Sequence, residues 1–337
     1  MLRHSAIFLA ILGAIPLFAQ RNLEVGVMTG VTHYYGDLGN INGPMQWNSA
    51  RPGLTITFRD FLNNPKRYVT RSLTTEARLS WFRIGYDERD MIKGMDVTDL
   101  KNYKRGLSFR NDLIGASGHL VLNAYREPFQ PLYQQRFFMT FHIGVGIYHG
   151  RPMADLFLGD MAPENRYYFW EDGTVRDAPR GTQGANVIQR DGKYETDLYD
   201  WVTESGKLGG GEGPVRDRMS PWHVAVPMGM GVRYMVTKEI SVGMEYCYMM
   251  FTTDLLDDVT HEYATYAEID AAYPNDPVKQ ELARYISDPT GWGTTGEESI
   301  LNSRRGNPGL LDSFSFVSLE VSYKFKRSPS RRSFVSL

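Results

Sequence analysis

The residues that could do chemistry are scattered along this chain. No G-x-S-x-G motif is present, and the candidate bases fall in different segments: His33, His142, His149, His223 and His261. A nucleophilic catalyst needs its nucleophile, its base and an orienting carboxylate in one place. We therefore predict a protein that is not an enzyme and has no cofactor.

The only cysteine, Cys247, cannot form a disulfide within the chain. It lies in a segment of alternating polarity, at a position that shares a face with small and charged residues. A buried cysteine on such a face behaves as a small packing residue. We predict that Cys247 has a structural role.

The strongest candidate for a metal site is acidic. Asp254, Asp257 and Asp258, together with Asp312, could supply oxygen ligands to Ca²⁺. Their spacing matches no calcium-loop motif, and aspartates also end strands by bonding nearby backbone amides. We favour the capped strand end and predict no metal site.

These aspartates follow a pair of segments in which apolar residues occupy every second position. The alternation runs from residue 222 to 236 and, after a tight turn, from 240 to 248. Period two with unlike faces is typical of a strand, and so short a connection predicts an antiparallel hairpin. The same pattern recurs in six further segments: 23–35, 54–58, 73–81, 107–124, 137–148 and 317–325.

The connections between these eight segments alternate in length. Those after the second, fourth and sixth segments are short, while two of the others, 151–220 and 254–311, are very long and acidic. Outer-membrane barrels have short periplasmic turns and long outer loops. We predict an all-β fold, an eight-stranded antiparallel transmembrane β-barrel with long extracellular loops. Ten strands stay possible, since part of the long loops could extend the sheet.

Composition agrees with a barrel. Aromatic residues make up 13% of the chain, and no long apolar run follows the N-terminus, which excludes a bundle of membrane helices. Residues 1–19 have the layout of a secretory signal peptide. The barrel is then expected over residues 20–326, with a basic tail at 327–337. A formal net charge of -2 gives no indication of nucleic-acid binding. Asp276 and Pro277 predict the start of one short helix within the second long loop.

Charged residues of both signs occupy the predicted inner face of the barrel. They are Glu24, Arg59, Glu76, Arg78, Arg233, Glu245, Glu320 and Lys324. Eight strands leave an interior that side chains can fill. We expect these charges to pair and plug the lumen, the alternative being an ion path. Arg233 and Glu245, near-opposite in the hairpin, are the first candidates for such a pair.

Several stretches resemble the PorG-like outer-membrane barrel component of the type IX secretion system. They are Tyr35, Gly36 and Asp37 in the first loop, Gly229 and Gly231 in one hairpin strand and Glu245 in the other, Asp254, Asp257 and Asp258 after it, and residues 305–308 before the last strand. The family has Tyr where this chain has Leu255, so a role that depends on that ring is not carried over.

The resemblance implies a non-catalytic part of a protein-export and gliding-motility machine in the outer membrane of a Gram-negative bacterium. Its partners would be a periplasmic ring lipoprotein, that lipoprotein's partner subunit and outer-membrane lipid. With both termini periplasmic, the expected docking residues are basic: Lys66, Arg67, Lys238, Lys326, Arg327, Arg331 and Arg332. The tail could equally be an ordinary solvated tail. A small-solute channel and a surface adhesin are the competing functions.

Overall fold

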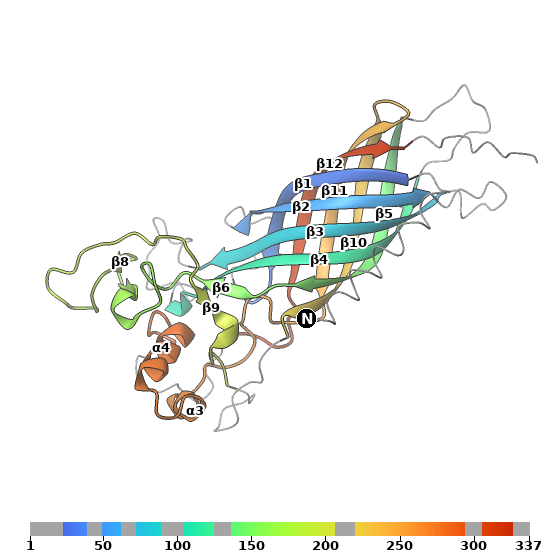
Figure 1. Cartoon of the computed structure of the whole chain (residues 1–337). Helices are drawn as coiled ribbons and strands as arrows, with labels where there is room; N and C mark the ends of the chain where they lie inside the picture. Colours follow the sequence, from blue (N-terminus) through green and yellow to red (C-terminus); the bar gives the residue numbers. More distant parts are fainter. Residues whose placement is uncertain are drawn as a thin grey trace, which may run out of the picture.

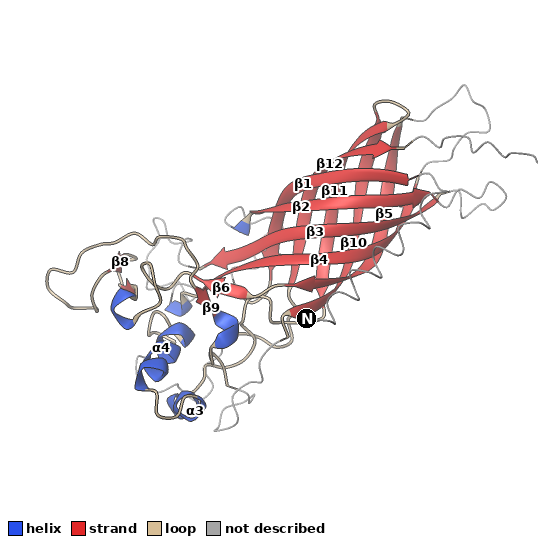
Figure 2. Cartoon of the chain, viewed as in Figure 1, coloured by secondary structure: helices blue, strands red, loops and turns tan. Residues whose placement is uncertain are grey.

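The computed structural model describes residues 23–38, 49–61, 72–88, 104–124, 136–205, 220–293 and 305–325. Eight long strands dominate it, and Figures 1 and 2 show them wrapped into one tilted cylinder. They are β1 (Leu23–Tyr35), β2 (Arg51–Phe61), β3 (Leu73–Asp87), β4 (Ser108–Asn123), β5 (Phe137–His149), β10 (Trp222–Met235), β11 (Ile240–Phe251) and β12 (Ser313–Lys324).

The cylinder is closed. The strands follow the order β3-β2-β1-β12-β11-β10-β5-β4, every pair is antiparallel, and a further pairing of β3 with β4 joins the two ends. Closure leaves no strand edge with unpaired amides, which a strand surrounded by lipid requires. The predicted eight-stranded antiparallel barrel is confirmed.

The outer face of the barrel is apolar. In β5 every second residue points outward and the rest are buried, and Ile143 is 56% exposed while its neighbour His142 is 5% exposed. Leu319 of β12 and Ile114 of β4 are exposed to a similar degree. A continuous apolar belt of this kind is stable against lipid and not against water. The fold is therefore a transmembrane barrel of the outer-membrane type.

The polarity of the two faces of the sheet is exchanged toward one end of the barrel, here called the mouth: inward side chains become apolar and outward ones polar. In the lower part of β3, Arg78 points inward and Leu79 outward; past Trp81, Phe82 and Ile84 point inward and Arg83 outward. This upper part is built like a soluble barrel, with an apolar interior. The alternation read from the sequence is lost at the inversion, which explains why β3 and β12 are longer than predicted.

The four longest connections between barrel strands, those after β1, β3, β5 and β11, leave from the mouth. The β10–β11 turn closes the opposite end, which also holds the first residue of β1 and the last of β12. The predicted signal peptide and tail lie outside the described residues.

Three segments pack together at the mouth as one body, which we call the loop lobe and which lies at the lower left of Figure 1. They are residues 150–205, 252–293 and 305–312. The loop lobe holds η4 (Pro163–Asn165), η5 (Leu198–Asp200), α3 (Tyr266–Ala272) and α4 (Pro277–Ser287), and the short strands β6 (Pro152–Ala154), β7 (Tyr168–Phe169), β8 (Val175–Arg176) and β9 (Thr196–Asp197). β6 and β9 extend the sheet from β4 but stay outside the closed cylinder.

The predicted helix is α4. The Asp276 side chain accepts the Lys279 amide at 3.1 Å, and Pro277 occupies the first turn. The sequence did not reveal α3, whose seven residues are too few to show a period and which depends on the capping box of Thr265 and Glu268. Among the helices of the described ranges, none has the length and apolar character to cross a bilayer.

Candidate functional site

Seven charged side chains fill the lower half of the lumen, and we call them the lumen network. They are Glu24, Arg59, Glu76, Arg78, Arg233, Glu245 and Glu320, each between 3% and 7% exposed. Because inward positions alternate along every strand, residues from six strands meet here. The predicted inward face is confirmed for all seven, while Lys324, at the end of β12, is only partly buried.

Arg59 is the centre of the network. Its Nη1 lies 2.5 Å from a Glu320 oxygen and 3.1 Å from a Glu24 oxygen, and its Nε donates to Glu76. Arg78 binds Glu245 through two nitrogens, at 2.5 and 3.0 Å, and also bonds Glu76. Such forked contacts fix both partners in orientation.

The predicted pair of Arg233 and Glu245 is wrong. Arg233 instead bonds Glu24, while Glu245 bonds Arg78. The hairpin register places Gly243 opposite Arg233 and Gly231 opposite Glu245, so the two charged residues are staggered. Each side chain therefore turns across the lumen to another strand.

The network leaves little open space. The cavity lined by Arg59, Glu76, Arg233, Glu245 and Glu320 has a volume of about 10 Å³. That is roughly the minimum needed to hold a single water molecule. The geometry favours the prediction of a plugged lumen over that of an ion path.

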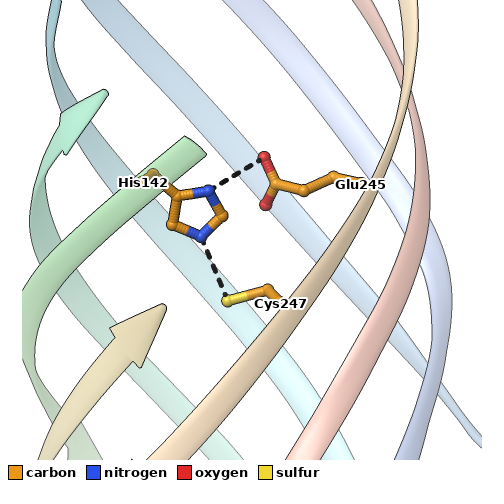
Figure 3. A group of neighbouring side chains, drawn as sticks. All are labelled: His142, Glu245 and Cys247. Carbon is orange, nitrogen blue, oxygen red and sulfur yellow. Dashed lines mark hydrogen bonds and ion pairs between the residues drawn. The ribbon is translucent and has the colours of Figure 1, made fainter. Parts of the chain in front are cut away.

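Above the network, His142 lies between Glu245 and Cys247 (Figure 3). The Nδ1 atom is 3.6 Å from a Glu245 oxygen, and the Nε2 atom is 3.4 Å from the Cys247 sulfur. Carboxylate, imidazole and thiol stand in the order of a nucleophilic triad, and the same atoms could be metal ligands. Gly229 makes room for the histidine, since a Cβ there would lie 2.7 Å from its ring.

Two features oppose both chemical interpretations of this trio. Arg78 already engages both Glu245 oxygens, and its positive charge disfavours a cation beside them. One ligand atom from each of the three residues lies within 4.8 Å of the others, but the thiol and the carboxylate face different ring nitrogens, which is unfavourable for a shared metal ion. Cys247 is 2% exposed, which matches the predicted structural role.

A second, largely buried group lies where β1 and β11 end and β12 begins, and we call it the mouth junction. It comprises Tyr34, Asp37, Asp254, Asp257 and Asp312. The Tyr34 hydroxyl lies 2.6 Å from an Asp257 oxygen and 2.7 Å from an Asp312 oxygen. A phenol has one proton to donate, so one of the two carboxyl groups must itself carry a proton and donate it.

The carboxyl groups of the mouth junction hold protons unusually well. Burial, reinforced by the charge of neighbouring Asp312, raises the pKa of Asp257 well above its usual range. Burial raises the pKa of Asp312 to about 7 and that of Asp254 to about 8. The pKa of Asp37, raised by burial to about 6, is moderated by the Asn307 amide and by Arg105. Neither oxygen of Asp254 has a hydrogen bond within 3.5 Å, although Thr260 is near enough to lower its pKa slightly.

Two of the four aspartates make the side-chain-to-backbone bonds that the capping interpretation predicts, although the amides lie in the loop after β11. Asp312 accepts the Leu256 amide at 2.8 Å, and Asp257 accepts the Val259 amide at 2.9 Å. Asp258 turns away with a φ of 65° and accepts the Thr203 hydroxyl at 2.7 Å. The four aspartates thus do not converge on one point, as a calcium ion would require.

Two arginines tie the loop lobe to the mouth junction. Arg305 is buried, lies 3.1 Å from Glu204 and also bonds the Asp258 carbonyl. Arg105 binds Glu88 and donates to the backbone carbonyls of Asp37 and Arg305, each at 2.7 Å. Arg305 belongs to a stretch singled out in the sequence, but nothing there indicated Arg105 or Glu204, which sit in loops that look solvated.

The residues of the family resemblance fall into two places. Asp37, Asp254 and Asp257 belong to the mouth junction, and Gly36 and Asp258 lie beside it; a Cβ on Gly36 would overlap Tyr34 and Asp312. Gly229, Gly231 and Glu245 lie in the barrel wall beside the lumen network. Tyr35 stands at the end of β1, its hydroxyl 3.3 Å from that of Ser315.

Of the predicted docking residues, the structure places only Lys238, which is exposed in the β10–β11 turn. The others lie outside the described residues: Lys66, Arg67, Lys326, Arg327, Arg331 and Arg332.

Comparison with known proteins returned solved structures. No family model matches the chain, and no curated protein does. The attachment invasion locus protein Ail of Yersinia pestis is 6% identical, with a TM-score of 0.32, covering 91% of this chain and 99% of Ail. OprG of Pseudomonas aeruginosa is 9% identical, with a TM-score of 0.32 and coverages of 91% and 98%. Likeness at this level carries no functional information.

Proposed function

We propose that this protein is a non-catalytic component of the type IX secretion machinery, a barrel that anchors a protein assembly in the outer membrane. The observation that carries the proposal is the meeting of separate resemblance stretches at the mouth junction. Residues 34–38, 254–259 and 305–308 are far apart in the chain, yet they are joined there by hydrogen bonds. The Tyr34 hydroxyl bonds Asp257, Arg305 bonds the Asp258 carbonyl, and the Asn307 amide donates to Asp37. The stretches that carry the resemblance thus meet in one region of the structure, in addition to occurring in the same order along the chain.

The filled lumen supports an anchor over a channel. A cavity of about 10 Å³ among paired charges offers no path for a hydrated solute. Planar-bilayer recordings with the pure protein distinguish the two functions. An anchor gives silence, and steady unitary openings would support the channel.

On this proposal the partners are the periplasmic ring lipoprotein and its companion subunit, and both chain ends are periplasmic. The exposed Lys238 then lies on the same side as the tail, since β1 begins and β12 ends at the end of the barrel where this turn lies. Basic side chains on that side would suit an acidic partner surface.

Affinity purification from detergent-solubilised outer membranes tests the proposal. The full chain, a chain truncated after Phe325 and a Lys238→Glu variant are compared, with Lys193→Glu in the loop lobe as a matched control. Recovery of ring subunits with the full chain and the control, and weaker recovery with either other variant, would support it. Absence of ring subunits from every sample would contradict it.

A surface-binding protein is the second candidate, because the loop lobe is an ordered body whose buried residues continue the apolar core of the mouth. Phe157, Leu282 and Ile286 are all buried there, and the Tyr285 hydroxyl donates to the Leu156 carbonyl at 2.8 Å. Deletion of residues 151–220 would unfold the partner segment that packs on it. Point substitutions on the lobe surface are therefore the appropriate test of this function.

A further inference from the structure

A cavity of about 270 Å³ opens in the loop lobe between the β7–β8 hairpin and the helices α3 and α4. Figure 1 places β8 beside α4, at the end of the lobe farthest from the barrel. The cavity is separate from the lumen network and the mouth junction, and the proposed anchoring function does not use it. Its volume lies just below the ~300 Å³ at which pockets for drug-sized molecules begin, so it suits a ligand of about one ring.

Three arginines line the cavity, and each lies against an aromatic ring. Arg166 lies 5.1 Å from the centre of the Tyr168 ring, Arg284 lies 4.5 Å from that of Tyr266, and Arg180 lies 4.4 Å from that of Trp292. Stacking holds a guanidinium in one plane and leaves its N–H edge free to bond an oxyanion.

The arginines retain donors for a ligand. A guanidinium has five N–H groups. The structure gives Arg180 one acceptor, the Thr290 carbonyl at 2.8 Å, and gives Arg284 one, Asp270 at 2.6 Å. The Arg284 Nε atom is buried without a hydrogen-bond partner. A buried N–H donor without a partner is destabilising until a ligand or a water molecule accepts its hydrogen bond.

The rest of the lining suits hydroxyl groups. Glu281 contributes a carboxylate that is 54% exposed and bonds Arg166 at 2.9 Å, and Asp288 contributes a second carboxylate. Carboxylates accept hydrogen bonds from sugar hydroxyls, whereas a bare inorganic anion would be repelled by them. Among the lining residues three arginines face two carboxylates, and Asp270, which bonds Arg284 from outside the lining, balances the third.

We propose that this cavity binds an acidic sugar, a single pyranose ring that carries a carboxylate. Arg180 and Arg284 bind the carboxylate, while Glu281 accepts hydroxyl protons from the opposite edge of the ring. A ligand of this cavity must carry an oxyanion and neighbouring hydroxyl groups, and it must be about the size of one ring.

Calorimetric titration of the full chain in detergent with glucuronate, glucose, acetate and sulfate tests this. Glucuronate should bind at least about tenfold more tightly than any of the other three, because each of them lacks one part of the recognised group. Arg180→Gln and Arg284→Gln should each weaken glucuronate binding by about tenfold or more.

Arg176→Gln is the matched control. Arg176 stacks on Trp170 at 4.1 Å in the same hairpin but is not part of the cavity lining. Its variant should bind glucuronate as the unmodified chain does. Equal binding of glucose would overturn the role of the arginines, and equal binding of sulfate or acetate would overturn the sugar class. No heat with glucuronate would overturn the proposal, and the comparison of the four probes holds even if a variant fails to fold.

Discussion

The lumen network and the mouth junction solve the same problem by different means. Both bury several carboxyl groups inside one barrel. In the lumen network four glutamates meet three arginines, so opposite charges compensate the loss of water. In the mouth junction the carboxyl groups meet a phenol, backbone amides and one another.

The difference decides what each region responds to. Ion pairs of glutamate and arginine persist over a wide range of pH, because the guanidinium never loses its proton there. Hydrogen bonds that depend on protonated carboxyl groups are lost when those groups release their protons. The lower barrel should therefore be insensitive to conditions that loosen the connection between barrel and loop lobe.

The largest effect is expected when the lumen network loses its central cation. Arg59→Leu leaves three glutamates buried without their shared partner, which should lower the free energy of unfolding by about 3 to 5 kcal/mol. Urea unfolding in lipid vesicles measures it. Arg83→Leu is the control, because its pair with Asp112 is about one-third exposed and should contribute less than about 1 kcal/mol. Equal losses would mean that the lumen is wetter than its packing indicates.

The second change removes the hydroxyl on which the mouth junction depends. Tyr34→Phe leaves Asp257 and Asp312 without their common partner and should destabilise the protein by about 1 to 3 kcal/mol. Hydrogen exchange at residues 254–259 should quicken more than exchange in β5. The adjacent Tyr35→Phe, which loses a 3.3 Å contact with the Ser315 hydroxyl at the part-buried strand end, should change little. If the two variants matched, the shared proton would have no structural role.

The third test separates the regions by pH. The pKa of Asp312 is raised to about 7 and that of Asp254 to about 8, while a free carboxyl titrates near 4. Between these values the folded chain holds protons that the unfolded chain has released, so stability falls as the pH rises through about 7 to 8. Protease protection of the loop lobe should be greater at about pH 6 than at about pH 8.5.

Asp254→Asn should make this pH profile flatter, because the amide cannot ionise. A mutant profile as steep as that of the unmodified chain would assign the effect to other groups. Protection that increases with pH would reverse the sign and contradict the protonated junction. The barrel strands themselves should stay protected throughout this range.

The smallest effect is expected at Cys247, between the two regions. Cys247→Ala removes a buried sulfur that lies 3.4 Å from His142 and should cost about 1 kcal/mol. Zinc should raise the melting temperature of neither form. A zinc-dependent increase that disappears with Cys247 would instead identify a metal site and break the contrast drawn above.

The strand pattern could be read from the sequence because lipid imposes it. Ile143 and Leu319 face outward for the same reason, wherever they fall in the chain. The partner of each inner charge could not be read, because it depends on how the closed sheet is staggered. The partner of Glu245 is Arg78, across the lumen and 167 positions away in the chain. From the sequence, Arg233 in the same hairpin as Glu245 was the expected partner.

The mouth junction was only half visible. The aspartates after β11 stand out as a cluster, and two side-chain bonds to backbone amides agree with the capping interpretation. Their raised pKa values could not be predicted from the sequence, because they result from burial. The residues next to Asp254 in the chain do not show whether its carboxyl group is buried or solvated. The cavity of the loop lobe was invisible as well, because its arginines come from segments more than 100 positions apart.

The position in β3 at which the polarity changes also gives the thickness of the membrane that the barrel fits. The lipid-facing part of this strand extends from Leu73 to Trp81, roughly 26 Å along the strand at ~3.3 Å per residue. At the ~40° tilt common in such barrels, this corresponds to a hydrophobic height of roughly 20 Å. That height matches a thin bilayer, and a thicker membrane would have to thin around the barrel. Hydrophobic mismatch would thus direct this chain toward the thinner membranes of a cell.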